Sequence, residues 1–218
     1  MKQETNRYDY LIILLIALVS LGGLGNAFQP FRLLVLAIFP FMSIAPLKNP
    51  KEYLSSKYER IFSIIWVLYA ITSLMWVIDM SESIKTLIYL VVYLISFSVF
   101  TYLATNAAEP QRDILKGWLL CFLLTGPVAA WELLTDTHLP SSFIEEGLVL
   151  RYGRRIALTR HFEAVNFGNL NGYNNMLCFF LPFNLLWILM SKGKEQLFGY
   201  ICLFLAAVIV IYNSSRAA

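Results

Sequence analysis

Long apolar blocks, separated by short polar stretches, are the main pattern along the chain. A helix needs ~20 apolar residues to cross the ~30 Å hydrocarbon layer of a membrane, with a tolerated range of ~17–25. Because the charged residues fall almost wholly between the blocks, each block is predicted to be a membrane-spanning helix. The seven predicted spans are roughly Tyr10–Leu24, Phe28–Leu47, Ile61–Ile78, Thr86–Leu103, Gly117–Leu134, Tyr173–Leu189 and Leu197–Tyr212.

The predicted fold is therefore all-α, a polytopic transmembrane helix bundle that forms one domain over residues 1–218. Hydrophobic residues make up 58% of the chain and charged residues 14%, against ~45–50% and ~25% in ordinary globular proteins. The net charge of +3 is not gathered into a basic patch, so we expect no nucleic-acid partner. The cysteines lie inside apolar blocks without paired or metal-ligand spacing, so we predict no disulfide, metal or cofactor.

Lysine and arginine in the short loops predict the orientation, since cytoplasmic loops are enriched in them. A cytoplasmic N-terminus leaves Lys85 as the only basic residue in a short outer loop. It also gives one long outer loop, residues 135–172, between the fifth and sixth spans. The basic residues assigned to the cytoplasm are Lys2, Arg7, Lys48, Lys51, Lys57, Arg60, Arg112, Lys116, Lys192 and Lys194.

The outer loop carries a dense cluster of positive charge on the side of the membrane where positive charge is normally scarce. An arginine presents a planar fork of donors that suits phosphate oxygens, so a lipid pyrophosphate is a candidate partner. Pairing with Glu145, Glu146 and Glu163 in the same loop, or contact with anionic headgroups, is the structural alternative. The four arginines are Arg151, Arg154, Arg155 and Arg160.

A second arginine site is expected at the outer end of the last span. A helix that starts after Lys194 rises ~30 Å by Arg216, at ~1.5 Å per residue. Arg216 then reaches the level of the arginine loop, so two separate regions converge on one layer. The alternative is a helix end whose arginine snorkels to the interface. Near the outer ends of two other spans, Arg32 and Glu132 are candidate partners in a structural salt bridge.

Asparagines crowd the entry to the sixth span, and two of them, Asn169 and Asn171, also suit a helix cap or a turn. Amide groups bind sugar hydroxyls, so Asn169, Asn171 and Asn174 are candidate glycan-binding residues. His161, beside Arg160 in the outer loop, is a candidate general base, with a solvated loop histidine as the alternative.

Two motifs carry a resemblance to a known family. One is the segment from Arg160-His161-Phe162 through Gly168-Asn169-Leu170-Asn171-Gly172 before a span, and the other is Ser215-Arg216-Ala217 after the next span. The arrangement resembles the bacterial O-antigen ligase and O-antigen polymerase family. Members of that family carry further spans and a large outer loop with a catalytic histidine beyond the matched region. We therefore expect this chain to be the N-terminal portion of a larger domain of that type.

The resemblance implies an enzyme that needs no metal and sits in the bacterial cytoplasmic (inner) membrane. Its donor would be a glycan on undecaprenyl pyrophosphate, and its acceptor a hydroxyl of another glycan or of lipid A core. Arg216 would be the motif arginine that holds the departing pyrophosphate. A polysaccharide exporter and a non-catalytic, truncated membrane subunit remain as alternatives, and few ionisable groups in the middle of the spans disfavour the exporter.

Overall fold

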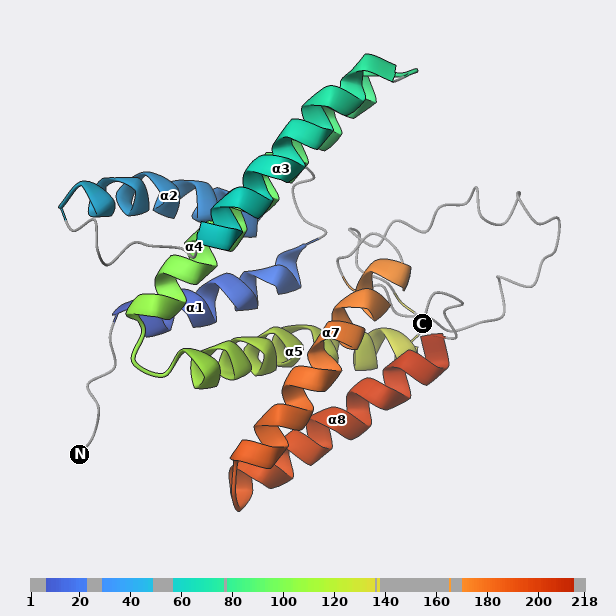
Figure 1. The fold of residues 1–218 in the computed structure, drawn as a ribbon. Helices are drawn as coiled ribbons and strands as arrows, with labels where there is room; N and C mark the ends of the chain where they lie inside the picture. Colours follow the sequence, from blue (N-terminus) through green and yellow to red (C-terminus); the bar gives the residue numbers. More distant parts are fainter. Residues whose placement is uncertain are drawn as a thin grey trace, which may run out of the picture. The chain divides into compact units, whose positions relative to one another are not determined.

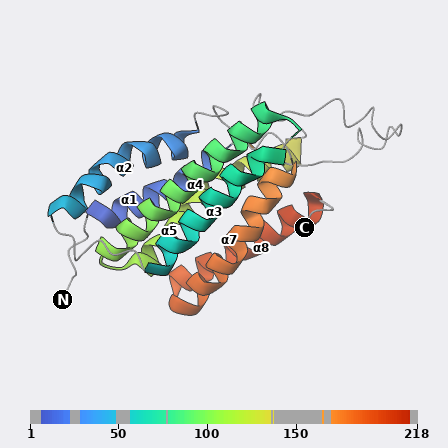
Figure 2. The same ribbon diagram turned by 45° about the horizontal axis from the view of Figure 1, so that its top comes forward.

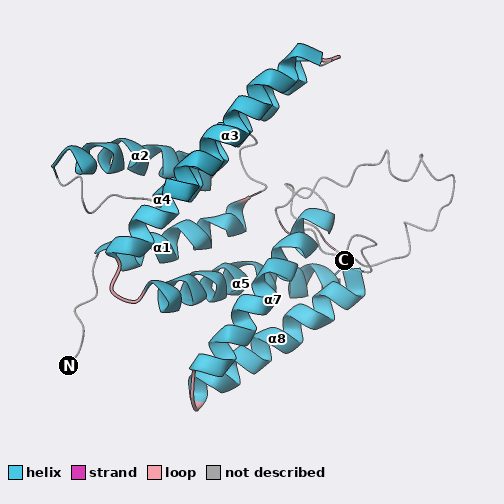
Figure 3. Cartoon of the chain, viewed as in Figure 1, coloured by secondary structure: helices cyan, strands magenta, loops and turns pink. Residues whose placement is uncertain are grey.

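The computed structural model describes residues 7–22, 29–48, 57–76, 78–135, 137, 165 and 170–213. Within these ranges the chain is helical with no strand, which confirms the predicted all-α class (Figure 3). Each predicted span coincides with one α-helix (Figure 1). The helices are α1 (Arg7–Ala17) with the 3₁₀ helix η1 (Leu18–Leu21), α2 (Pro30–Lys48), α3 (Lys57–Ser73) with the 3₁₀ helix η3 (Leu74–Trp76), α4 (Met80–Asn106), α5 (Pro110–Thr135), α7 (Leu170–Met190) and α8 (Lys194–Asn213).

Four of the described helices, α4, α5, α7 and α8, are long and apolar enough to cross a membrane. They leave much of their apolar surface uncovered, since only 17% of the most apolar window of α4 is buried. Large side chains such as Ile88 and Phe97 are exposed along α4. Such a helix suits hydrocarbon as its solvent, because an apolar helix face in water loses the benefit of burial.

The chain divides into two compact units, and unit 1 contains Met1–Asp9 and Arg32–Ala108. In unit 1, α3 and α4 lie side by side as a hairpin joined through η3 (Figure 2). The side chain of Asp79 caps α4 by accepting a 3.2 Å hydrogen bond from the backbone N–H of Glu82. At the other end of α4, the buried Asp9 accepts a 2.9 Å bond from the N–H of Ala108. In unit 1, aspartate side chains thus accept hydrogen bonds from backbone N–H groups at both ends of α4.

Unit 2 contains Tyr10–Phe31 and Glu109–Ala218, so it holds most of α1 with η1, and α5, α7 and α8. A turn of three residues joins α7 and α8, which lie side by side in both views (Figures 1 and 2). Gly193 in this turn has a φ of 61°, a left-handed conformation that glycine adopts without steric cost. The backbone N–H of Ser191 donates a 2.9 Å hydrogen bond to the carbonyl of Trp187, which satisfies this carbonyl at the end of α7.

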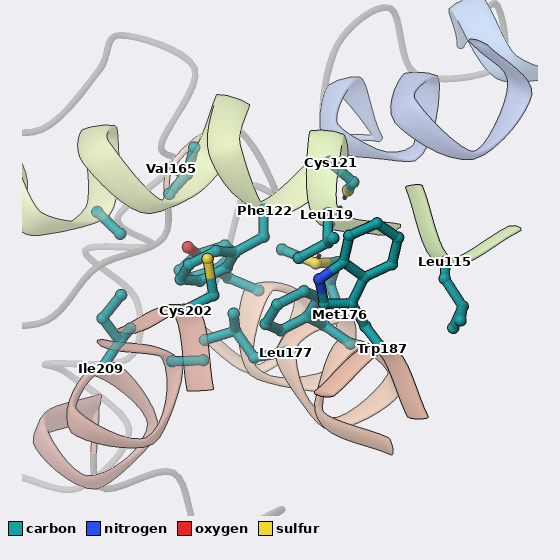
Figure 4. Close-up of a cluster of buried hydrophobic side chains, with 14 residues drawn as sticks. Leu115, Leu119, Cys121, Phe122, Val165, Met176, Leu177, Trp187, Cys202 and Ile209 are labelled. Atoms are coloured by element: carbon teal, nitrogen blue, oxygen red, sulfur yellow. Dashed lines mark hydrogen bonds between the residues drawn. The ribbon is translucent and has the colours of Figure 1, made fainter. Parts of the chain in front are cut away.

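The core of unit 2 lies where α5 packs on the α7–α8 hairpin. Phe122 of α5 stacks on Phe180 of α7 with 4.5 Å between ring centroids, and Trp118 stacks on Phe183 at 5.4 Å. Cys202 and other residues of α8 complete the cluster (Figure 4). Stacked aromatic pairs add stabilisation beyond their buried area, so they fix the register of α5 against α7.

Two glycines allow helices of unit 2 to approach closely. A Cβ on Gly117 of α5 would lie 2.8 Å from the Cβ of Ile16 in α1. A Cβ on Gly199 of α8 would lie 2.6 Å from Cγ1 of Ile188 in α7. The same close approach lets the buried side chain of Asn184 donate a 2.9 Å hydrogen bond to the carbonyl of Gly199. Small residues and cross-helix hydrogen bonds hold helices together in membranes, and both occur at this interface.

The α7–α8 interface predicts a strong effect of one substitution. Gly199→Val places a branched side chain against Ile188, and overpacking of this kind costs ~1–3 kcal/mol. For a chain of this length each kcal/mol lowers the melting temperature by about 2–4 °C. Thermal unfolding of the purified protein in detergent measures the change. Leu205→Val, at an exposed position of the same helix, is the control, and equal melting temperatures for both variants would contradict the assigned packing.

Candidate functional site

Three helix ends that border the candidate motifs lie at the same end of unit 2, which we name the loop end. It consists of the end of α5 at Thr135, the start of α7 at Leu170 and the end of α8 at Asn213 (Figure 1). The α7–α8 hairpin brings the end of α8 back to the start of α7. In the sequence, the segment with the arginines, residues 151–160, lies between α5 and α7, and the Ser215-Arg216-Ala217 motif follows the end of α8.

A buried carboxylate marks the loop end. Glu132, near the end of α5, is fully buried. Its Oε2 accepts a 2.9 Å hydrogen bond from the backbone N–H of Val165, a residue 33 positions further along the chain. Burial of a carboxyl group costs free energy unless hydrogen bonds compensate for the lost water, and the bond from Val165 supplies part of that compensation. Glu132 thereby ties the segment before α7 to the end of α5.

Val165 has an unusual backbone. Its φ is 51°, in the left-handed region that costs a β-branched residue free energy. Its side chain is 3% exposed and belongs to the hydrophobic cluster of unit 2 (Figure 4). Burial of the side chain and the hydrogen bond to Glu132 offset the strain. Tertiary contacts, and not local preference, therefore set the conformation at this point.

The start of α7 adds polar groups to the loop end. Tyr173 and Asn174 are both buried in the first turns of this helix. Asn174 is one of the predicted glycan-binding residues, and the structure places it inside the unit, at the loop end. Asn171 lies in the first turn of α7, with its side chain outside the description. Further along the same helix Met176 and Phe180 are buried and apolar, and the next buried polar side chain is Asn184, which bonds to Gly199 of α8.

Most of the predicted site residues lie outside the described residues, and their predicted roles stay predictions. Two described residues, Arg32 and Glu132, were candidate partners in a salt bridge. The Arg32 guanidinium carbon lies 4.7 Å from the ring centroid of Tyr89 in unit 1, whereas Glu132 belongs to unit 2, so that pairing also stays a prediction. The predicted site residues outside the description are Arg151, Arg154, Arg155, Arg160, His161, Asn169 and Arg216.

The described part of the chain contains no group of three histidine, cysteine or carboxylate side chains that would hold a metal ion. What the loop end offers is hydrogen bonding, with a buried carboxylate, a phenol and an amide set into an apolar cluster. Such groups form hydrogen bonds with backbone N–H and C=O groups and with hydroxyl groups. Comparison of the chain with protein-family models, curated proteins and solved structures finds no match.

The role of Glu132 was missed by the sequence reasoning. Its signal was a single glutamate near the end of an otherwise apolar block. A carboxylate that remains in such a block needs a partner inside the protein, and intramembrane ionisable residues mark functional or structural sites. The partner is a backbone N–H, at Val165, and no pattern of side chains along the sequence identifies it.

Two substitutions of Glu132 test whether its hydrogen bond to Val165 stabilises the protein. Glu132→Leu leaves the N–H of Val165 without this acceptor, and a buried group left unsatisfied costs ~1–3 kcal/mol. Glu132→Gln keeps an acceptor oxygen at the same distance along the side chain and should stay much closer to the wild type. Thermal unfolding in detergent compares the three proteins. A Leu variant as stable as the Gln variant would show that the bond contributes nothing measurable.

Proposed function

We propose that the protein is a membrane-embedded transferase that moves a glycan from a lipid pyrophosphate to an acceptor hydroxyl, in the manner of O-antigen ligases and polymerases. Undecaprenyl pyrophosphate is the proposed carrier, and the bacterial cytoplasmic membrane is the proposed location. The proposal rests on the likeness of the segment 160–172 and of Ser215-Arg216-Ala217 to the motifs of that family.

One structural observation carries the proposal furthest, namely the convergence at the loop end. The segments with the two motifs directly adjoin the start of α7 and the end of α8, which meet there. The buried bond from Glu132 to Val165 holds the chain between the arginine segment and the asparagine segment. This arrangement supports a site assembled from both motifs, because their points of attachment are close.

The orientation that we propose has a cytoplasmic N-terminus and seven spans. The opposite end of unit 2, which we name the hairpin end, consists of the start of α5 at Pro110 and the turn between Met190 and Lys194. Arg112 from the start of α5 lies 3.9 Å from Glu195 of α8, so the two basic segments belong to one end. The positive-inside rule favours a cytoplasmic hairpin end, and the loop end then faces outward.

The proposed reaction needs a base and a charge stabiliser. The acceptor hydroxyl oxygen forms a bond to the anomeric carbon, and the bond from that carbon to the pyrophosphate oxygen breaks. The electron pair leaves with the pyrophosphate, where Arg216 and the loop arginines stabilise the negative charge. The hydroxyl proton passes to a base, for which His161 is the candidate. Neither step requires a metal or a cofactor.

The described helices favour transfer over ion-coupled export. The described residues contain three buried acidic side chains, Asp9, Asp113 and Glu132, and no buried basic one. Each of the three lies within the first or last turns of its helix, so no buried acidic or basic side chain lies in the middle of a described helix. Ion-coupled transporters carry ionisable residues near the midplane of the membrane, along the path of the substrate.

A complementation experiment tests the function. The full reading frame that contains this chain is introduced into a strain that lacks its surface-glycan ligase or polymerase. Arg216→Ala is expected to reduce surface glycan by at least ~100-fold, because loss of one preorganised group at a developing charge costs about that factor. Lys192→Ala, at the hairpin end, is the control and should restore glycan fully. Membrane levels of each variant are measured in parallel. Failure of the wild type to restore glycan in such strains would overturn the proposal.

The orientation has its own test. Alkaline phosphatase is active only outside the cytoplasm, and green fluorescent protein is fluorescent when it folds inside. Phosphatase fused after Thr137 is expected to be active, and fluorescent protein fused after Lys192 is expected to fluoresce. The reversed pair of fusions is the control and should be silent. Activity of the reversed pair would contradict the proposed orientation, whatever the protein does.

A further inference from the structure

A groove lies at the hairpin end of unit 2, away from the loop end that carries the proposed transfer. Its volume is about 350 Å³, at the small end of the ~300–1,000 Å³ range of ligand pockets. The start of α5, the end of α7 and the start of α8 form its walls. The charged residues that line it are Lys116, Lys194 and Glu195.

The rest of the groove lining is apolar. It consists of Leu119, Leu120, Leu123, Trp187 and Phe198. Leu120 and Leu123 remain exposed, although they lie on a helix that is apolar enough to span a membrane. An apolar wall on such a helix is suited to a hydrocarbon chain, because a ligand dissolved in water would not reach it within the bilayer.

The charges at the hairpin end do not cancel. Lys116 donates a 3.0 Å hydrogen bond to Oδ1 of Asp113, whose side chain is 2% exposed. The guanidinium of Arg112 forms two ion pairs, one at 3.5 Å from Nη1 to Oε2 of Glu109 and one at 3.9 Å from Nη2 to Oε2 of Glu195. Each of these three carboxylates thus has a cation beside it, and Lys194, which is exposed, has no ion pair among the described residues.

The balance at this end is one positive charge. Four basic side chains stand against the three carboxylates, and the difference is 4 − 3 = +1. The basic side chains are Arg112, Lys116, Lys192 and Lys194. Asp113 also keeps Lys116 at the groove wall, so one of the two lysines of the groove is positioned before any ligand arrives.

We propose that this groove binds an anionic glycerophospholipid. The phosphate lies between Lys194 and Lys116, and the first part of one acyl chain lies against Leu120, Leu123 and Phe198. Basic pockets between membrane helices on the cytoplasmic side bind anionic headgroups, and this groove combines such charges with an apolar wall.

The indole of Trp187 fixes the boundary between the two parts of the groove. Its Nε1 donates a 3.2 Å hydrogen bond to the carbonyl of Glu195, while its ring lines the groove. An aromatic side chain with an apolar body and a bonded polar tip is typical of the membrane interface. The headgroup therefore lies on the side of this ring that carries Lys194, and the acyl chain lies on the other. The inference is independent of the proposed transfer reaction, which takes place at the loop end.

Native mass spectrometry tests the lipid site. The full chain is reconstituted in nanodiscs that contain equal amounts of phosphatidylglycerol and phosphatidylcholine, and the lipids that remain bound on release are counted. The wild type is expected to retain phosphatidylglycerol preferentially. Lys194→Gln is expected to lower the ratio of retained phosphatidylglycerol to phosphatidylcholine by about fivefold, the effect of one basic residue at an anionic headgroup. Lys194→Arg keeps the charge and should keep the preference.

A matched control separates the groove from general charge. Lys192→Gln removes the same charge from the same turn, at an exposed residue that does not line the groove, and should leave the ratio near the wild-type value. Leu120→Trp fills the apolar wall and should reduce retention of both lipids. Circular dichroism and size-exclusion profiles verify that each variant is folded. Equal losses in the Lys194 and Lys192 variants, no lipid preference in the wild type, or a dimer that covers Leu120 would each overturn the proposal.

Discussion

Helices in hydrocarbon cannot be held together by the hydrophobic effect, because lipid tails are as apolar as the side chains that they would replace. The packing of unit 2 suits this constraint, because its helices approach closely, with no side chain at Gly117 or Gly199 to keep them apart. The hydrogen bond from Asn184 to the carbonyl of Gly199 adds a polar contact at the same place. The aromatic stacks between α5 and α7 complete the packing and hold α5 against the hairpin whose open side is the loop end.

The pattern of apolar blocks was sufficient to predict every α-helix that the structure describes, because a block long and apolar enough for a membrane span favours a helix, in which all backbone hydrogen bonds stay within the segment. The pattern predicted the first residues of the helices less accurately. Helix α4 begins at Met80 and α5 at Pro110, well before the predicted Thr86 and Gly117. Polar first turns extend these helices beyond their apolar portion, since Asp79 caps one of them and a proline at the first position suits the other.

The candidate site was less predictable than the helices. Asn174 was selected as a polar residue near a span, and the structure places it at the loop end, but the contact between Glu132 and Val165 depends on tertiary structure alone. The left-handed φ of Val165 contradicts the local preference of valine, so no reading of nearby residues predicts it. A sequence gives the cost of a buried carboxylate but does not identify the backbone donor that compensates it.

The lengths of the connections in unit 2 bear on how it assembles. Asn184 and Gly199 are 15 residues apart and are joined by a three-residue turn, so their contact is local. Glu132 and Val165 are 33 residues apart, and their contact must close a longer stretch of chain. Local contacts form at lower entropic cost and therefore earlier in folding than distant ones. We therefore expect the α7–α8 hairpin to form first, and the bond from Glu132 of α5 to Val165 to form after it.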